Sequence, residues 1–359
     1  MKLTEATLFR RFSVNFHRNL TMKLGEMSFF KDWINDSRGD PYPLISGAAD
    51  ETVSDGLYTV QNGAVTRMMG AFFPWATYDV TLDSLQNASF GFVVDSTEGE
   101  ISAILSPDAL TVRFDGEEHT FPAAYESGDT FSVTFRTGGI SAYFVRNGAS
   151  HLIADLSGEI MHRLRKESVF SAAKVLLRID AASDGLCVIS RAEWHIDAGI
   201  SQADPKPIRY EDGTPIIENG RIFLTVSART EEDMYQFVAS WDYSTCDFRL
   251  VGALFFDCGD GYWCGDVASS IIFDRTANVW RIWMCAFSHG HILARGTSLA
   301  DPRFGINVID VALMEPASKT SALTDFVGFE GDEDPDLILI DGKWHLAVCR
   351  VEPDTGYHY

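Results

Sequence analysis

Residues Asp212–Val226 read DGTPIIENGRIFLTV, and residues Asp334–Val348 read DPDLILIDGKWHLAV. When the Asn-Gly turn of the first stretch is placed on the Asp-Gly turn of the second, Asp212 falls on Asp334. Between them, Asp266–Trp283 reads DVASSIIFDRTANVWRIW. Each stretch has an acidic residue, an apolar strand, a polar turn and a second apolar strand. Such a recurring hairpin is typical of the blades of a β-propeller.

The three acidic residues would stand at the start of the inner strand of each blade, where the central pocket of a propeller lies. Five blades of roughly 50 residues each would need about 250 residues. Residues 201–359 supply two blades and the start of a third. We therefore expect an incomplete five-bladed propeller, which a partner chain or a further C-terminal segment completes.

The composition is that of a globular protein, with 46% hydrophobic and 22% charged residues. The net charge is −22 and the isoelectric point about 4.7. Such acidity argues against nucleic acid and against anionic membrane surfaces, because both are bound by Lys and Arg. It leaves a neutral carbohydrate as a ligand class.

The six cysteines form no Cys-x-x-Cys pair, and no His cluster accompanies them, so the sequence predicts no metal site. No stretch has the spacing of a phosphate loop, and we expect no cofactor. The N-terminus lacks the continuous apolar segment of a signal peptide, which predicts a cytoplasmic protein. No run of 18 apolar residues predicts a membrane span.

Residues 31–200 contain short alternating apolar runs between turn signals, which predict about ten antiparallel strands in a two-sheet sandwich. Gln61-Asn-Gly63 reads as a turn between two of them. The rhythm, with a long last strand ending near Trp194, resembles the jelly-roll sandwich of the concanavalin-like lectins. Residues 1–30 read as an N-terminal extension. Ser201–Pro207 reads as a polar linker to the propeller part, 201–359.

The acids that precede PII, VASSII and LILI carry a second resemblance. Residues 204–359 resemble the five-bladed propeller glycoside hydrolases of the arabinanase, xylosidase and invertase group. The resemblance implies Asp212 as base or nucleophile, Asp266 as the group that orients and tunes the acid, and Glu333 as the acid. Asp334 competes for the last role because it aligns with Asp212. Glycosidic cleavage requires two carboxyl groups in different protonation states.

The same register suggests further candidates for substrate binding, each with a structural alternative. Arg229 and Arg350 could bind a carboxylate or hydroxyl, or form a surface ion pair. Tyr262 and Trp263 could stack on a sugar, although a role in the core is common for a Trp in such a position. His289 and His291 could hydrogen-bond a sugar or lie on a solvated turn. The full set is Arg229, Tyr262, Trp263, His289, Asp336 and Arg350.

Turn chemistry is the structural alternative for the acids, because Asp-Gly and Asp-Pro are ordinary turn dipeptides. The sequence therefore supports three functions. The first is a glycoside hydrolase acting on a polysaccharide or oligosaccharide. The second is a carbohydrate-binding protein without catalysis. The third is a glycoside phosphorylase, for which Arg229 and Arg350 would bind phosphate.

Overall fold

The computed structural model describes residues 22–25, 44–72, 74–136, 138–158, 163–170, 172–196, 201–229, 234–290, 292–314 and 331–351. Most of these residues lie in β-strands, so the all-β prediction is confirmed. The chain divides into two compact units, with the boundary between residues 197 and 198. Within the described ranges, no helix is long and apolar enough to cross a membrane.

The described part of unit 1 consists of strands and one short helix. These are β1 (Met22–Gly25), β2 (Leu44–Ser54), β3 (Leu57–Ala71), β4 (Ala76–Gln86), β5 (Ser89–Ser96), β6 (Gly99–Leu105), β7 (Ala109–Phe114), β8 (Glu117–Pro122), β9 (Asp129–Phe135), β10 (Gly139–Arg146), β11 (Ala149–Ser157), α4 (Glu167–Phe170) and β12 (Lys174–Ile196).

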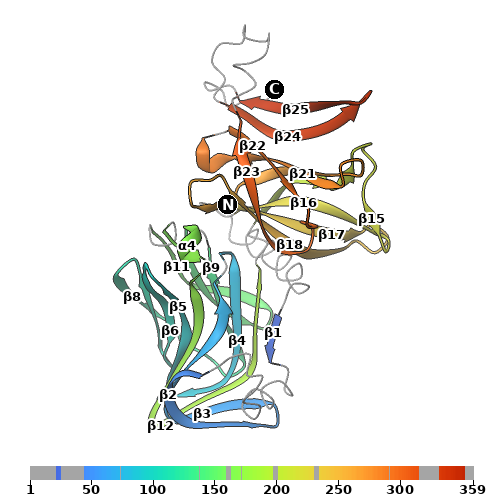
Figure 1. Cartoon of the computed structure of the whole chain (residues 1–359). Coiled ribbons are helices and arrows are strands. Elements are labelled where there is room, and N and C mark those ends of the chain that lie inside the picture. Colours follow the sequence, from blue (N-terminus) through green and yellow to red (C-terminus); the bar gives the residue numbers. More distant parts are fainter. Residues whose placement is uncertain are drawn as a thin grey trace. The chain divides into compact units, whose positions relative to one another are not determined.

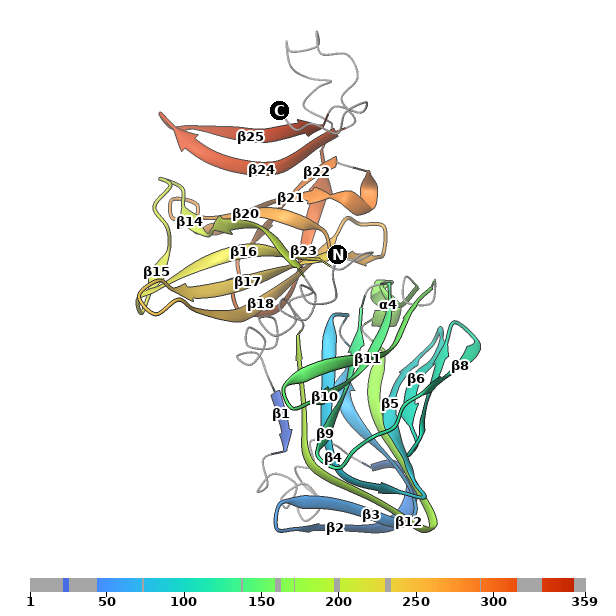
Figure 2. The ribbon, with the colours of Figure 1, turned by 180° about the vertical axis from the view of Figure 1, so that it is seen from behind.

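The strands of unit 1 form one hydrogen-bonded sheet of twelve strands, which folds into two packed layers, here called its two sheets. Strand β12 is the centre of unit 1 and belongs to both layers (Figures 1 and 2). Its first part, Lys174–Asp180, pairs with β5, and its second part, Leu186–Ile196, pairs with β4. From β5 the sheet continues through β6, β7 and β8, and from β4 through β9, β10 and β11. The ladder between β12 and β3 is interrupted between Ala181 and Leu186, where the strand passes from one sheet to the other.

Aromatic side chains fill the space between these two sheets. Phe92 of β5 and Phe131 of β9 stack with their ring centroids 6.2 Å apart, and Phe90 meets Phe131 edge to face at 6.1 Å. These rings are fully buried. Because β5 and β9 belong to different sheets, the contacts close the sandwich, and the predicted β-sandwich is confirmed.

The predicted turn at residues 61–63 is wrong. β3 runs without interruption from Leu57 to Ala71, and Asn62 and Gly63 form a bulge inside it with φ values of 52° and 158°. Asn tolerates the left-handed conformation in a bulge as well as in a turn, so the dipeptide alone does not separate the two structures.

A buried ion pair at one end of unit 1 leads to a testable pH dependence. Arg146 donates from Nε and Nη2 to the two carboxylate oxygens of Asp129 at 2.8 and 2.6 Å, and Asp129 is 3% exposed. Burial by itself would raise the pKa of Asp129, but the bonds from Arg146 and from the amide of Glu126 outweigh it and lower the pKa below 3.8. The ion pair therefore stabilises the fold above pH 3.8, and this contribution is lost as the pH falls through the lowered value.

We expect Asp129→Asn to lower the free energy of unfolding at neutral pH, by an amount that shrinks as the pH falls below about 4. Urea unfolding at a series of pH values measures this difference. Asp95→Asn, at an exposed position in β5, is the matched control and should change little. A difference that stays constant from about pH 6 to about pH 3 would contradict the assignment.

The described part of unit 2 consists mainly of strands. These are β13 (Ser201–Pro207), β14 (Arg209–Tyr210), β15 (Ile217–Glu218), β16 (Arg221–Arg229), β17 (Met234–Asp242), β18 (Asp247–Asp257), β19 (Trp263–Cys264), β20 (Val267–Asp274), β21 (Val279–Ala286), β22 (Ile292–Ser298), β23 (Gly305–Leu313), β24 (Gly331–Ile340) and β25 (Lys343–Val351).

The strands of unit 2 form two antiparallel four-stranded sheets and a hairpin. The first sheet has the order β13-β16-β17-β18, and the second has the order β20-β21-β22-β23. The parallel pairs β18–β23 and β14–β20 connect their edges, so that both belong to one eleven-stranded sheet. Buried residues of both sheets, among them Phe223, Leu254, Ile282 and Met284, share one core.

The hairpin β24–β25 lies against β20, β21 and β22 (Figure 1). Alternation along β21 explains this layering, because Ile282 and Met284 face the shared core while Trp283 and Cys285 face the hairpin. The second and third repeats are therefore hairpins, as the sequence predicts. A closed five-bladed propeller stays a prediction.

Two expectations for the start of unit 2 are wrong. Ser201–Pro207 is not a linker but strand β13, which pairs with β16. The apolar strand expected after Asp212 is only the two-residue β15. β13 takes the edge position, where Pro205 and Pro207 are tolerated because one side of the strand has no ladder to interrupt.

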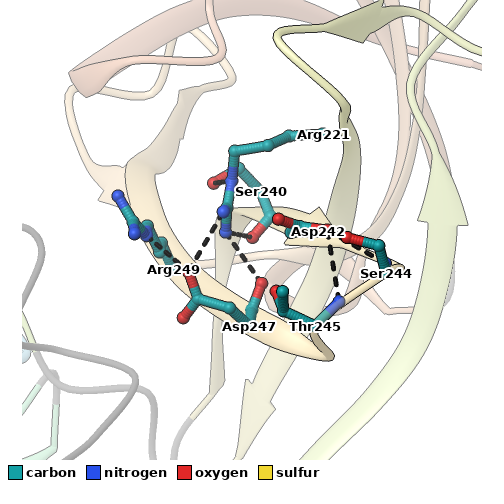
Figure 3. A network of polar contacts seen from close by, with 7 residues as sticks. All are labelled: Arg221, Ser240, Asp242, Ser244, Thr245, Asp247 and Arg249. Atoms are coloured by element: carbon teal, nitrogen blue, oxygen red, sulfur yellow. Dashed lines mark hydrogen bonds and ion pairs between the residues drawn. The ribbon is translucent and has the colours of Figure 1, made fainter.

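A polar network holds together the end of the β17–β18 hairpin (Figure 3). Arg221 donates to the side chain of Ser240 at 3.0 Å and to the carboxylate of Asp247 at 3.0 Å. Arg249 bonds the same carboxylate at 2.7 Å, and Asp242 accepts the amide of Ser244 at 2.9 Å. These contacts satisfy turn groups, so this network is structural.

Candidate functional site

Three strands of unit 2 share a β-bulge: β13, which precedes the first repeat, and the first strands of the second and third repeats. In β13, β20 and β24 the ladder register shifts between Ala203 and Lys206, between Val267 and Ser270, and between Glu333 and Asp336, respectively. Each bulge contains a residue with positive φ. These are Asp204 at 53°, Ala268 at 60° and Asp334 at 49°.

The bulges fix a register that differs from the one inferred from the turns. Asp204-Pro205 in β13 corresponds to Asp334-Pro335 in β24, and Ala268 occupies the same place in β20. The Asp-Pro dipeptide, whose Pro is followed three residues later by Ile (Ile208 and Ile338), is the sequence signal that could have found it. A longer connection after β13 shifted the turn-based alignment by eight residues, from Asp204 to Asp212.

Lys206 joins the three bulged strands. Its Nζ donates to the carbonyl oxygen of Ala268 at 3.0 Å and to that of Pro335 at 3.2 Å. Burial lowers the pKa of Lys206, while the nearby charges of Asp334, Asp336 and Asp204 oppose the shift. One ammonium group therefore lies among carboxylates contributed by two of the three strands.

Three of the four predicted catalytic residues lie close together. Asp266 and Glu333 are 3% and 7% exposed, and both lie near enough to Cys285 of β21 to affect its thiol, as does Asp334. Burial raises the pKa of Cys285, and these three negative charges raise it further. Cys285 Sγ also donates to the carbonyl of Asp332 at 3.8 Å, which connects β21 to β24.

Asp212 is not part of this acid cluster, which consists of Asp266, Glu333 and Asp334 around Cys285. It accepts the Thr214 amide at 2.9 Å in an exposed turn and pairs with Arg275 at 2.5 Å, and these contacts lower its pKa to about 2. Arg275 follows the last residue of β20, whereas Asp266 precedes the first. Eight strand residues at about 3.3 Å each separate them by roughly 25 Å. The structure therefore does not bring Asp212 next to Asp266, although the prediction placed both at one pocket; the catalytic role of Asp212 stays a prediction.

Arg229 and Asp336 have structural partners. Arg229 forms an ion pair with Asp204 at 2.8 Å. Asp336 accepts from Arg209 at 2.5 Å and from Ser270 at 3.0 Å, so it connects β24 to β14 and β20. Arg350 lies opposite Asp332 in the β24–β25 ladder, and its side chain is outside the described part.

The aromatic pair Tyr262 and Trp263 lies in the connection between β18 and β20. Trp263 pairs with Asp257 in the β18–β19 ladder, and both aromatic side chains are half-buried. This short ladder holds the connection close to Asp266. Both aromatic residues precede Asp266 in this connection, and their role as a sugar platform stays a prediction.

His289 lies in the 3-10 helix η1 (Phe287–His289) and meets the same connection. One ring nitrogen, Nε2, lies 3.2 Å from a carboxylate oxygen of Asp260, and the other, Nδ1, lies 2.9 Å from Ser288 Oγ. Asp266 accepts from the amide and hydroxyl of Ser288 at 2.9 and 2.7 Å. Ligand atoms of Cys258, Asp266 and His289 lie within 4.8 Å of one another, a grouping that the sequence spacing did not indicate. His291 is outside the described residues.

A cavity of about 650 Å³ lies between the second sheet and the hairpin β24–β25. Trp283 and Trp344 supply aromatic surface, and Arg295 and Asp310 supply polar groups. Trp283 is two residues from Cys285 on the same face of β21, so the cavity begins about 7 Å along the strand from the acid cluster. Its mixture of indole rings and polar side chains suits a ligand with alternating apolar faces and hydroxyl groups.

Comparisons with known proteins add little to this picture. No protein-family model matches the sequence, and no curated protein is significantly similar to it. Among solved structures, the apo Crh5 transglycosylase has 14% identity and a TM-score of 0.33 over 52% of this chain and 88% of its own. A glycosyl hydrolase family protein from Mycobacterium fortuitum has 12% identity and a TM-score of 0.30 over 40% and 78%.

The PSpry domain of TRIM65 is similar at the same level, with 9% identity and a TM-score of 0.29 over 41% of this chain and 86% of its own. Likeness this weak carries no argument about activity. Membership of the propeller glycoside hydrolases, inferred from the sequence, stays a prediction.

Proposed function

We propose that the chain is a glycoside hydrolase that cleaves a polysaccharide or oligosaccharide with carboxyl groups at the bulges of unit 2. The observation that carries the proposal is the common place of the three bulges in β13, β20 and β24. In a propeller these strands would be the innermost strands of three successive blades. Repetition of a strained bulge at one level favours a site over three unrelated turns.

We base the proposed catalytic roles on the register of the bulges. Asp204 replaces Asp212 as the base or nucleophile, and Arg229 orients its carboxylate at 2.8 Å. Glu333, which is nearly excluded from water, is the acid that protonates the leaving oxygen, and Asp334 is its rival. Lys206 is a positioning residue because it bonds the backbone of the two other bulged strands. The indole rings of Trp283 and Trp344 would stack on the sugar chain.

The experiment compares Asp204→Asn with Asp212→Asn in an assay of reducing-end release on a panel of plant and microbial polysaccharides. We expect Asp204→Asn to lower kcat by about 100-fold or more, since it removes a general base or nucleophile. Asp212→Asn should stay within about twofold of wild type because its carboxylate serves an exposed turn. The opposite pattern would overturn the register.

The same panel separates the rival functions. Turnover that requires phosphate would indicate a phosphorylase. Glycan binding without any turnover, unchanged when Asp204 and Glu333 are both neutralised, would indicate a carbohydrate-binding protein and would refute the hydrolase proposal.

A further inference from the structure

Three side chains with metal-binding chemistry converge beside the acid cluster from three different segments. Cys258 follows β18, Asp266 precedes β20, and His289 ends the 3-10 helix after β21. One ligand atom of each lies within 4.8 Å of the other two. Asp266 is 3% exposed, and Cys258 and His289 are half-buried, so the group is partly shielded from solvent.

Hydrogen bonds already orient two of these side chains. Ser288 lies between Asp266 and His289, because its Oγ donates to Asp266 at 2.7 Å and lies 2.9 Å from His289 Nδ1. The Nδ1 atom is therefore the ring nitrogen on the side of Asp266. On the other side of the ring, Nε2 lies 3.2 Å from Asp260. A carboxylate on the distal nitrogen is the usual support of a metal-binding histidine, since it fixes the tautomer and the ring orientation.

We propose that Cys258 Sγ, a carboxylate oxygen of Asp266 and His289 Nδ1 bind one Zn²⁺ ion, with Asp260 supporting the histidine through Nε2–H. Thiolate, imidazole and carboxylate together select zinc, whereas Ca²⁺ and Mg²⁺ prefer sites made of oxygen atoms. Three protein ligands leave a fourth position for water.

Binding of one zinc ion requires only a small movement of the three ligand atoms. Bonds of about 2.0 to 2.3 Å in a tetrahedron place the ligand atoms roughly 3.5 Å apart. From separations of up to 4.8 Å, the three atoms therefore need to approach one another by about 1.3 Å at most, which side-chain rotation supplies. Nδ1 gives up its contact with Ser288 Oγ, and Ser288 keeps its bonds to Asp266.

The surrounding charge favours a cation. Asp257, Asp260 and Asp266 lie near enough to Cys258 for their negative charges to act on its thiol, and a divalent cation bound there would offset these charges.

Calorimetric titration of the chelator-treated full chain with Zn²⁺ tests the site near neutral pH. We expect one equivalent to bind, and Cys258→Ser and His289→Asn each to weaken binding by at least about 100-fold. Asp260→Asn, which changes an exposed residue and no ligand, should weaken it by about 10- to 100-fold. Cys246→Ser and His345→Asn are the matched controls at exposed positions and should bind like wild type.

Co²⁺ used in place of Zn²⁺ gives a second readout, since a thiolate ligand produces a charge-transfer band that Cys258→Ser must abolish. Far-UV circular dichroism identifies a variant that fails to fold, and Asp260→Asn then decides the matter. Failure of the wild type to bind one equivalent, or wild-type affinity in Cys258→Ser, would overturn the site. The inference does not rest on the proposed hydrolase, because every readout measures the metal and none measures turnover.

Discussion

Glu333→Gln is expected to lower the turnover of a natural oligosaccharide by about 10³-fold, within the range of 10² to 10⁴ that general acid catalysis contributes. Gln has the shape of Glu and keeps the packing of this buried position in β24, but it cannot donate a carboxylic proton to the leaving oxygen. Initial rates of reducing-end release measure the loss.

The leaving group distinguishes a lost acid from a damaged site. A nitrophenyl glycoside has a leaving group that departs without protonation, so Glu333→Gln should be much less impaired on it than on a natural substrate. Asp341→Asn, in the exposed Asp-Gly turn of the same hairpin, is the control. If Asp334→Asn shows this leaving-group pattern and Glu333→Gln does not, the acid is Asp334. Equal loss on both substrates would argue against an acid at either position.

Lys206→Met is expected to lower the free energy of unfolding of unit 2 by about 2 to 3 kcal/mol. Met keeps most of the apolar volume of the lysine stem but leaves the carbonyls of Ala268 and Pro335 without this donor. It also removes the cation near Asp204 and Asp334. Removing one partner of a fully buried ion pair lowers the free energy of unfolding by about 3 to 5 kcal/mol. We expect a smaller effect for Lys206 because this residue keeps some contact with solvent.

Urea unfolding and hydrogen exchange at β20 and β24 measure this effect, and the exchange data place it at the bulges. Lys343→Met, on an exposed position of β25, is the control. The double variant Lys206→Met with Asp334→Asn should recover part of the stability, because it removes a carboxylate that the lysine no longer balances. No change in exchange near Ala268 and Pro335 would contradict the bridging role.

Local signals in the sequence were sufficient for much of the fold. The turns at Asn219-Gly220 and Asp341-Gly342 form as predicted, because two consecutive residues with positive φ suit Asn or Asp followed by Gly. The alternation of apolar residues located the strands of the sandwich, since its period reflects one buried face.

What the sequence did not reveal depends on partners that are distant in the chain. β13 contains Pro205 and Pro207 and reads as a linker until β16 pairs with it. The position of Asp212 away from Asp266 was missed for the same reason, since the turn signal is local and the bulge register is not. The grouping of Cys258, Asp266 and His289 likewise follows from the packing of three segments. The spacing of these residues in the sequence does not reveal this packing.

The path of β12 through both sheets of unit 1 has a consequence for synthesis on the ribosome. β4 and β5 are complete by Ser96, yet the strand that pairs with both begins only at Lys174. Nearly 80 residues must therefore emerge while these two strands still expose unpaired edges, a situation that favours association between nascent chains. The sandwich therefore cannot complete its folding until its last strand is present. A chain cut before residue 174 should be bound by chaperones and degraded by proteases, and should not form a smaller stable domain.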